Sequence, residues 1–203
     1  MKKLLSALLT LSVALAIGTP AFADTQVTHI VKSGESMWKI AVKYQVGVSE
    51  IINANPQISN PDLIYPNQRL IVPLKSETDK GIENQVLSLV NSERSKQGKQ
   101  ALTLNWELSR VAKVKSQDMA TNRYFSHQSP TYGSPFDMMQ NFGIQYRTAG
   151  ENIAYGQTTP DQVMRDWMNS SGHRANILSS SYTQLGVGYV SDGHYWTQMF
   201  IGK

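Results

Sequence analysis

The second half of the chain holds the residue types that could move protons or bind a metal ion. His127, Glu151 and His173 each lie in a short polar stretch, and no two of them are close in sequence. A carboxylate with two imidazoles could act as a general acid and base or bind a divalent cation. The chain contains no His-Glu-x-x-His, Gly-x-Ser-x-Gly or phosphate-loop motif, so the fold must assemble any such site from distant segments. These three residues are the candidate catalytic residues.

Periodic apolar residues predict the elements that would carry these side chains. Offsets of three and four residues predict helices over 82–90 and 108–119, and the pairs Ser134-Pro135 and Thr159-Pro160 predict two further helix starts. Alternating apolar residues over 185–189 and 196–201, with a turn between them, predict a β-hairpin. We expect the three candidates at turns or element ends, and we assign His194 to packing or to the surface. Helices followed by a hairpin predict an α+β fold with helices packed on an antiparallel sheet.

A smaller unit precedes this one. Apolar and turn residues predict a strand, two helices and a strand within residues 24–75, and the polar stretch 76–81 is predicted to be a linker to residues 82–203. So small a unit has little core. We expect most of that core to come from six residues, Trp38, Ile40, Ile51, Ile52, Leu63 and Ile71.

The first 23 residues are typical of a secretory signal peptide. Lys2 and Lys3 precede an apolar run over 4–17 and the small-residue site Ala21-Phe22-Ala23. The run is shorter than a membrane-spanning helix needs, and we expect no membrane span in the mature chain. Without the two lysines the chain would carry 17 basic and 15 acidic residues. No basic cluster stands out, so we expect no nucleic-acid partner. The absence of cysteine excludes disulfides and a thiol nucleophile.

Three separated motifs in the first unit resemble a LysM domain. They are Val31 to Ala41, Asn53-Ala54-Asn55-Pro56 and Ile64 to Leu70, in the expected order and spacing. The resemblance implies a groove for N-acetylglucosamine glycans, with peptidoglycan or a chitin-like glycan as the partner. Its implied glycan-binding residues are Gly34, Glu35, Ser36, Met37, Asn55, Pro56, Gln57 and Ile58. The alternative is that Gly34 only forms a turn and Asn55 only ends a helix.

Five motifs in the larger unit resemble a bacterial CAP domain, the SCP-like superfamily of cysteine-rich secretory and pathogenesis-related proteins. They are Tyr124 to His127, Ala149 to Ala154, Trp167 to Leu178, Gly186 to Tyr189 and Tyr195 to Phe200. The resemblance implies an α-β-α sandwich, so the whole chain is predicted as a small βααβ LysM domain followed by this sandwich.

The same resemblance implies a central cleft that carries two histidines and two acidic residues. His127, Glu151 and His173 match three of these positions, whereas Ser170 stands where the second acidic residue is found in eukaryotic members. The three residues could hold zinc with an open position for water, or they could form a hydrogen-bonded polar cluster. Zinc is therefore the one cofactor that the sequence suggests, and the missing carboxylate counts against it.

Two functions from different classes are compatible with these patterns. The first is a secreted protein of the cell wall or spore surface that binds peptidoglycan through LysM and carries a CAP domain with a binding or signalling role. The alternative is a divalent-metal-dependent hydrolase that acts on a wall or extracellular substrate through the CAP cleft. A third reading, a lipid pocket lined by methionines such as Met138 and Met164, competes with ordinary core packing at helical spacing.

Overall fold

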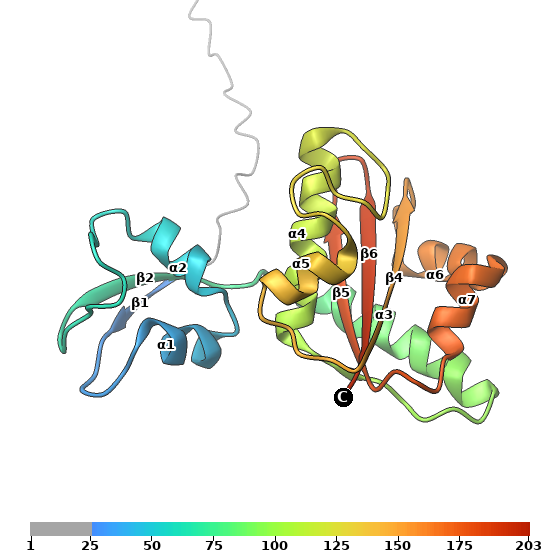
Figure 1. The fold of residues 1–203 in the computed structure, drawn as a ribbon, viewed down its shortest axis with the longest axis horizontal. Helices are drawn as coiled ribbons and strands as arrows, with labels where there is room; N and C mark the ends of the chain where they lie inside the picture. Colours follow the sequence, from blue (N-terminus) through green and yellow to red (C-terminus); the bar gives the residue numbers. More distant parts are fainter. Residues whose placement is uncertain (1–25) are drawn as a thin grey trace, which may run out of the picture.

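The computed structural model describes residues 26–203 as two α+β units (Figure 1). The predicted signal peptide, residues 1–23, lies outside these residues. No helix of the described part is long and apolar enough to cross a membrane.

The N-terminal unit has the predicted order of strand, helix, helix and strand. Its elements are β1 (Gln26–Ile30), α1 (Met37–Tyr44), α2 (Val48–Ala54) and β2 (Arg69–Pro73). The strands pair antiparallel, with Thr28 opposite Ile71. Helix α1 begins at Ser36, whose hydroxyl accepts from Lys39 N at 3.3 Å, because an N-cap oxygen satisfies an otherwise free amide. Ile40 and Ile51 are fully buried between the helices and the two strands, as predicted.

The C-terminal unit is a four-stranded sheet covered by helices on both faces. Its elements are α3 (Glu77–Lys96), β3 (Thr103–Leu104), α4 (Trp106–Asn122), α5 (Pro135–Asn141), β4 (Thr148–Tyr155), α6 (Pro160–Asn169), α7 (Ser171–Leu178), β5 (Gln184–Val190) and β6 (Tyr195–Gly202). The strand order is β3-β5-β6-β4, with β5 and β6 forming the predicted hairpin. Helices α4 and α5 cover one face, and α3, α6 and α7 cover the other (Figure 1). The sandwich prediction is thus confirmed.

Two glycines let α4 lie directly on the sheet. A Cβ atom at Gly186 or Gly188 of β5 would collide with the backbone of α4. At this close approach the Ser109 hydroxyl accepts from Val187 N at 3.1 Å, and the Ser116 hydroxyl donates to Gly188 O at 3.2 Å. The polar face of α4 that meets the sheet therefore has its hydrogen bonds satisfied.

Methionines fill the layer beneath α4 rather than line a pocket. Met138 and Met139 are fully buried in one cluster with Met199 and Ile201, and Met164 packs in the opposite layer. Core packing is thus the role of Met138 and Met139. Met164 also lines a shallow hollow of about 280 Å³ beside Met168, whose other lining residues include Glu93, Asp161 and Arg165, so this hollow is too polar for the lipid-pocket reading.

Four expectations from sequence are corrected. Trp38 and Leu63 are exposed, by 63% and 55%, and so do not form core. Residues 77–81 are helical rather than an irregular linker, because the Ser76 hydroxyl accepts from Asp79 N at 3.0 Å and starts α3. Glu151 lies inside β4 and not at a turn. By contrast, His194 packs on Tyr189 as expected, with its Nδ1 2.7 Å from the Tyr189 hydroxyl, in a turn where its φ is 54°.

Candidate functional site

An open groove of about 780 Å³ runs along the edge strand of the larger sheet. Residues of β4 form its floor. Strand β4 is the edge strand because β6 is its one neighbour in the described sheet. The loop between α4 and α5 forms one wall, and α7 forms the other. The lining brings together His127, Glu151 and His173, the three residues predicted from sequence. Residues that are far apart in the chain thus meet at this edge of the sheet.

Glu151 and His127 form the central polar pair of the groove. Nδ1 of His127 lies 2.7 Å from Oε1 of Glu151. The Glu151 side chain is 1% exposed, whereas that of His127 is 53% exposed. Oε2 of Glu151 is buried without a hydrogen-bond partner. Burial raises the pKa of Glu151, although the His127 hydrogen bond and the positive charge of Lys115 oppose this shift.

His173 lies on α7 and lines the same groove. Burial and the neighbouring His127 lower its pKa, so its neutral form is favoured. Its backbone oxygen accepts from Asn152 Nδ2 at 3.1 Å, and Asn176 Nδ2 donates to Glu151 O at 3.2 Å. Asn152 and Asn176 therefore satisfy backbone groups and join α7 to β4.

Two buried charges on α4 hold the loop that carries His127. The ammonium of Lys115 donates to Ser126 O at 2.8 Å, to His127 O at 3.0 Å and to the Tyr124 hydroxyl at 3.0 Å. Asp118 accepts from the hydroxyls of Ser129, at 2.7 Å, and Tyr124. These residues set the position of His127 above Glu151.

Lys115 and Asp118 were missed at the sequence level, although a signal was present. Lys115 lies four residues from both Val111 and Met119, on the face of α4 that otherwise packs into the core. A buried lysine at such a position destabilises the fold unless its ammonium is hydrogen-bonded or paired with a carboxylate. Burial lowers the pKa of Lys115. At Asp118 burial opposes ionisation, yet hydrogen bonds from its neighbours together lower the pKa.

The donor set does not form a metal site in this structure. Within residues 26–203, no three His, Asp or Glu side chains are gathered so that they could hold a metal ion. Ser170, which occupies the position expected for the second acidic residue, lies between α6 and α7 and offers no carboxylate. Oε1 of Glu151 is already bonded to His127. The geometry therefore supports proton transfer between a carboxyl and an imidazole, and the predicted zinc remains without structural support.

The loops of the smaller unit use several predicted glycan residues internally. Asn55 is 1% exposed. Its amide donates to Ile51 O and Ile71 O, both at 2.7 Å, and its oxygen accepts from Ile71 N at 2.8 Å. Met37 is buried. Asn55 therefore fixes α2 to β2, and its role in glycan binding stays a prediction.

Other groups in the predicted glycan loops remain at the surface. Gly34, with a φ of 79°, makes an exposed turn whose carbonyl accepts from Lys39 Nζ at 2.7 Å. Glu35 accepts from Lys32 N at 2.8 Å and from His29. Ser36, Pro56 and Gln57 are exposed, and Ile58 is half-buried. These residues could present backbone groups and a small apolar patch to a sugar.

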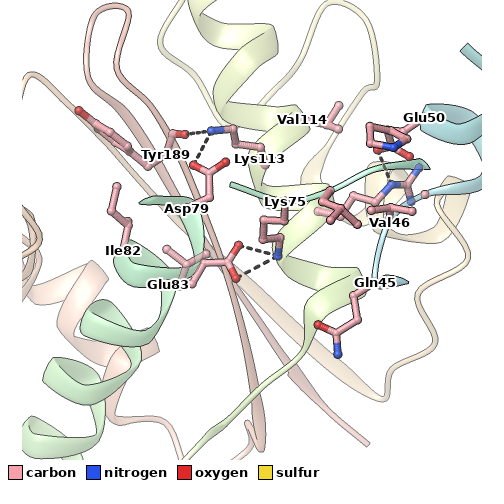
Figure 2. A pocket seen from close by; sticks show the side chains of 15 residues that line it. Gln45, Val46, Glu50, Lys75, Asp79, Ile82, Glu83, Lys113, Val114 and Tyr189 are labelled. Atoms are coloured by element: carbon pink, nitrogen blue, oxygen red, sulfur yellow. Dashed lines mark hydrogen bonds and ion pairs between the residues drawn. The ribbon is translucent and has the colours of Figure 1, made fainter. Parts of the chain in front are cut away.

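Three ion pairs lie at the junction of the two units. Arg110 of α4 donates to Glu50 of α2 at 2.7 Å. Lys75, directly after β2, contacts both oxygens of Glu83 at 2.8 and 3.0 Å, and Lys113 contacts Asp79 at 2.9 Å. Figure 2 shows the Lys75–Glu83 and Lys113–Asp79 pairs at a cavity of about 180 Å³, which Arg110 and Glu50 also line. Burial raises the pKa of Glu83 despite its contact with Lys75.

Family models match both units of the chain. The LysM domain model matches residues 29–73, and the cysteine-rich secretory protein (CAP) model matches residues 87–201. The chain is 60% identical over 121 residues to the uncharacterized protein YkwD of Bacillus subtilis, which covers 60% of this chain and 47% of YkwD. It is 42% identical over 71 residues to the N-acetylmuramoyl-L-alanine amidase sle1 of Staphylococcus saprophyticus, covering 35% of this chain and 21% of that protein.

A solved structure supports the same assignment. An extracellular protein with an SCP domain from Bacillus anthracis superposes with a TM-score of 0.60 at 36% identity, over 68% of this chain and 47% of that one. The chain thus spans less than half the length of each of these three proteins. It belongs to the cysteine-rich secretory protein (CAP) family and carries a LysM domain ahead of its CAP domain.

Proposed function

We propose that this protein is exported and binds peptidoglycan through its LysM domain, which holds the CAP domain at the cell wall or spore surface. The LysM match over residues 29–73, with exposed residues in both predicted loops, carries the proposal. The similarity to an N-acetylmuramoyl-L-alanine amidase is consistent with a wall location. The CAP domain then has a binding or signalling role next to the glycan.

Co-sedimentation with insoluble peptidoglycan tests this proposal. The purified protein is expected in the pellet, and a chain that lacks residues 24–75 is expected in the supernatant. Gln57→Ala changes an exposed loop residue whose amide donates to Asn55 Oδ1 at 3.2 Å, and it is expected to weaken pelleting while lowering the melting temperature by only a few degrees. Gln26→Ala, at an exposed position of β1 away from both loops, is the matched control. Full pelleting of the deletion variant would show that LysM is not the anchor.

A second candidate is acid and base catalysis in the CAP groove. The buried, partly unsatisfied carboxyl of Glu151 beside the exposed imidazole of His127 favours it, because groups with shifted pKa values in an open groove are typical of reactive sites. In this reading Glu151 acts as the general base through His127, whose exposed imidazole takes a proton from water. The hydroxide attacks the carbonyl carbon of an ester or peptide, or the anomeric carbon of a glycan, the bond to the leaving group breaks, and His127 returns the proton to the leaving group. The substrate is a wall or extracellular ester, peptide or glycan. Release of soluble fragments from walls by the protein, and none by Glu151→Gln, would support it. Equal release by both would refute it.

A further inference from the structure

Trp38 is an exposed tryptophan that is not one of the predicted glycan-binding residues. It lies on α1, whose other side supplies Met37, Ile40 and Ala41 to the LysM core. Trp38 is 63% exposed. Val42, one helical turn further on, shares its side of α1 and is only partly buried. Helix α1 therefore has a second apolar side, which lies outside the core of its own domain.

This second side of α1 faces a groove at the junction of the two domains, which we call the junction groove. Its volume is about 370 Å³, within the range of roughly 300–1,000 Å³ that is usual for small-molecule sites. Trp38 and Val42 line it from the LysM side, and Trp106, Glu107, Asn141 and Phe142 line it from the CAP side. It is separate from the groove that holds Glu151.

Arg110 fixes the two walls of the junction groove relative to each other. Its Nε donates to Glu50 Oε1 at 2.7 Å, and its Nη2 donates to the Ser49 hydroxyl at 2.9 Å. Its guanidinium also lies 5.3 Å from the centre of the Phe142 ring. One side chain of α4 thereby contacts α2 and the end of α5. The groove is therefore a preformed feature, which lowers the entropy cost of binding there.

The lining fits a neutral sugar ring better than an ion or a purely apolar molecule. Two tryptophans offer flat apolar surfaces, and the C–H face of a pyranose is apolar while its edge carries hydroxyl and acetamido groups. Glu107 and Asn141 supply polar groups beside the rings. The charge of Arg110 is already matched by Glu50, so Glu107 leaves the groove with a net negative charge that disfavours carboxylate-bearing sugars.

We propose that the junction groove binds one neutral pyranose of an N-acetylglucosamine chain, with Trp38 stacked on the ring. This inference rests on the proposed glycan binding by LysM and adds a subsite to it. A glycan that occupies both places would contact the CAP domain as well as the LysM domain. The protein would thus bind long chains more tightly than the LysM loops alone would allow.

Titration of the purified protein with the hexamer of N-acetylglucosamine tests this subsite. Trp167 and Trp196 are buried, so a fluorescence change on binding would report on Trp38 and Trp106. Trp38→Ala is expected to weaken hexamer binding roughly fivefold to tenfold, the size of one lost aromatic contact, and to abolish most of the fluorescence change. Trp38→Phe is expected to retain most of the affinity. Tyr155→Ala, at an exposed aromatic residue outside both sites, is the matched control and should bind like the unchanged protein.

The outcomes separate this inference from the function on which it rests. Unchanged hexamer affinity in Trp38→Ala, with loss of binding in Gln57→Ala, would overturn the subsite and leave LysM binding in place. Failure of the unchanged protein to bind either hexamer or peptidoglycan would overturn both. A change in sedimentation from dimer to monomer on Trp38→Ala would show instead that the groove joins two copies of this chain, and would also overturn the subsite.

Discussion

Each domain contains a histidine and a glutamate joined at 2.7 Å, but the two pairs are buried in opposite senses. In LysM the His29 side chain is 4% exposed and that of Glu35 is 19% exposed. In CAP the histidine, His127, is 53% exposed and the glutamate, Glu151, is 1% exposed. The histidine is therefore the more buried partner in LysM and the glutamate is the more buried partner in CAP, although the contact distance is the same.

The pKa shifts of the two carboxyls have opposite directions for this reason. The amide of Lys32 and the ring of His29 both donate to Glu35 and lower its pKa. Burial dominates at Glu151 and raises its pKa. The first pair is a structural link that keeps its carboxylate charged, and the second keeps a carboxyl that can accept or release a proton nearer neutral pH. A hydrogen bond between the same two residue types thus does not by itself identify a reactive site.

The largest expected effect comes from removing the charge that lies under the CAP pair. Lys115→Ala deletes a fully buried ammonium and its three hydrogen bonds to the loop of His127. We expect a loss of about 3 kcal/mol of stability, because the acceptors are left unsatisfied and Glu151 and Asp118 lose a nearby positive charge. Thermal unfolding should show a fall in melting temperature of roughly 10 °C.

Lys96→Ala is the matched control for this change. It removes the same charge from an exposed lysine that is paired with Glu93 on one helix. Such surface pairs contribute about 0.5 kcal/mol. Equal melting temperatures for the two variants would mean that Lys115 does not hold the loop.

A smaller effect is expected when each histidine is replaced. His29→Ala removes a buried ring that contacts Glu35 and the Tyr44 hydroxyl at 3.1 Å, and we expect a loss of about 2 kcal/mol. His127→Ala removes an exposed ring but leaves the buried Glu151 carboxyl without its one side-chain hydrogen bond, and we expect a loss of about 1 kcal/mol. Urea unfolding of both variants measures the difference. A larger loss for His127→Ala would contradict the contrast between a structural and an exposed histidine.

The order of elements was predictable from sequence, because it depends on local patterns. Helix starts such as Ser134-Pro135 and the alternation in β5 and β6 indicate their elements without tertiary information. Strand β4 was not recognised, since Gly150, Glu151 and Asn152 have low strand propensity. Pairing with β6 and side-chain bonds from α7 stabilise it, and neither is visible in the local sequence.

The site was only partly predictable for a related reason. The identities of His127, Glu151 and His173 followed from the family resemblance. Which of these side chains is buried and which is exposed depends on how α4 and α7 pack on β4. Trp38 was assigned to the core because its helix has one clear apolar stripe. Its true place depends on a second domain beside α1, and helical periodicity alone does not report that neighbour.

The smallest but sharpest effect is an opposite pH dependence in two glutamine variants. The Glu35 pKa is lowered from 4.5, so the folded state holds fewer protons than the unfolded state, and Glu35 adds stability above that pH. That contribution is lost as the pH falls through the folded pKa. Glu35→Gln should therefore be less stable than the unchanged protein at pH 7, and the difference should shrink in acid.

Glu151→Gln is expected to behave in the opposite way. The pKa of Glu151 is raised from 4.5, so the folded state holds more protons, and ionisation costs stability as the pH rises through the folded pKa. A neutral side chain of the same shape avoids that cost. The variant should therefore gain stability relative to the unchanged protein as the pH rises from 4 to 8. Calorimetric melting of both variants over this range measures the two slopes, and slopes of the same sign would mean that burial does not distinguish the pairs.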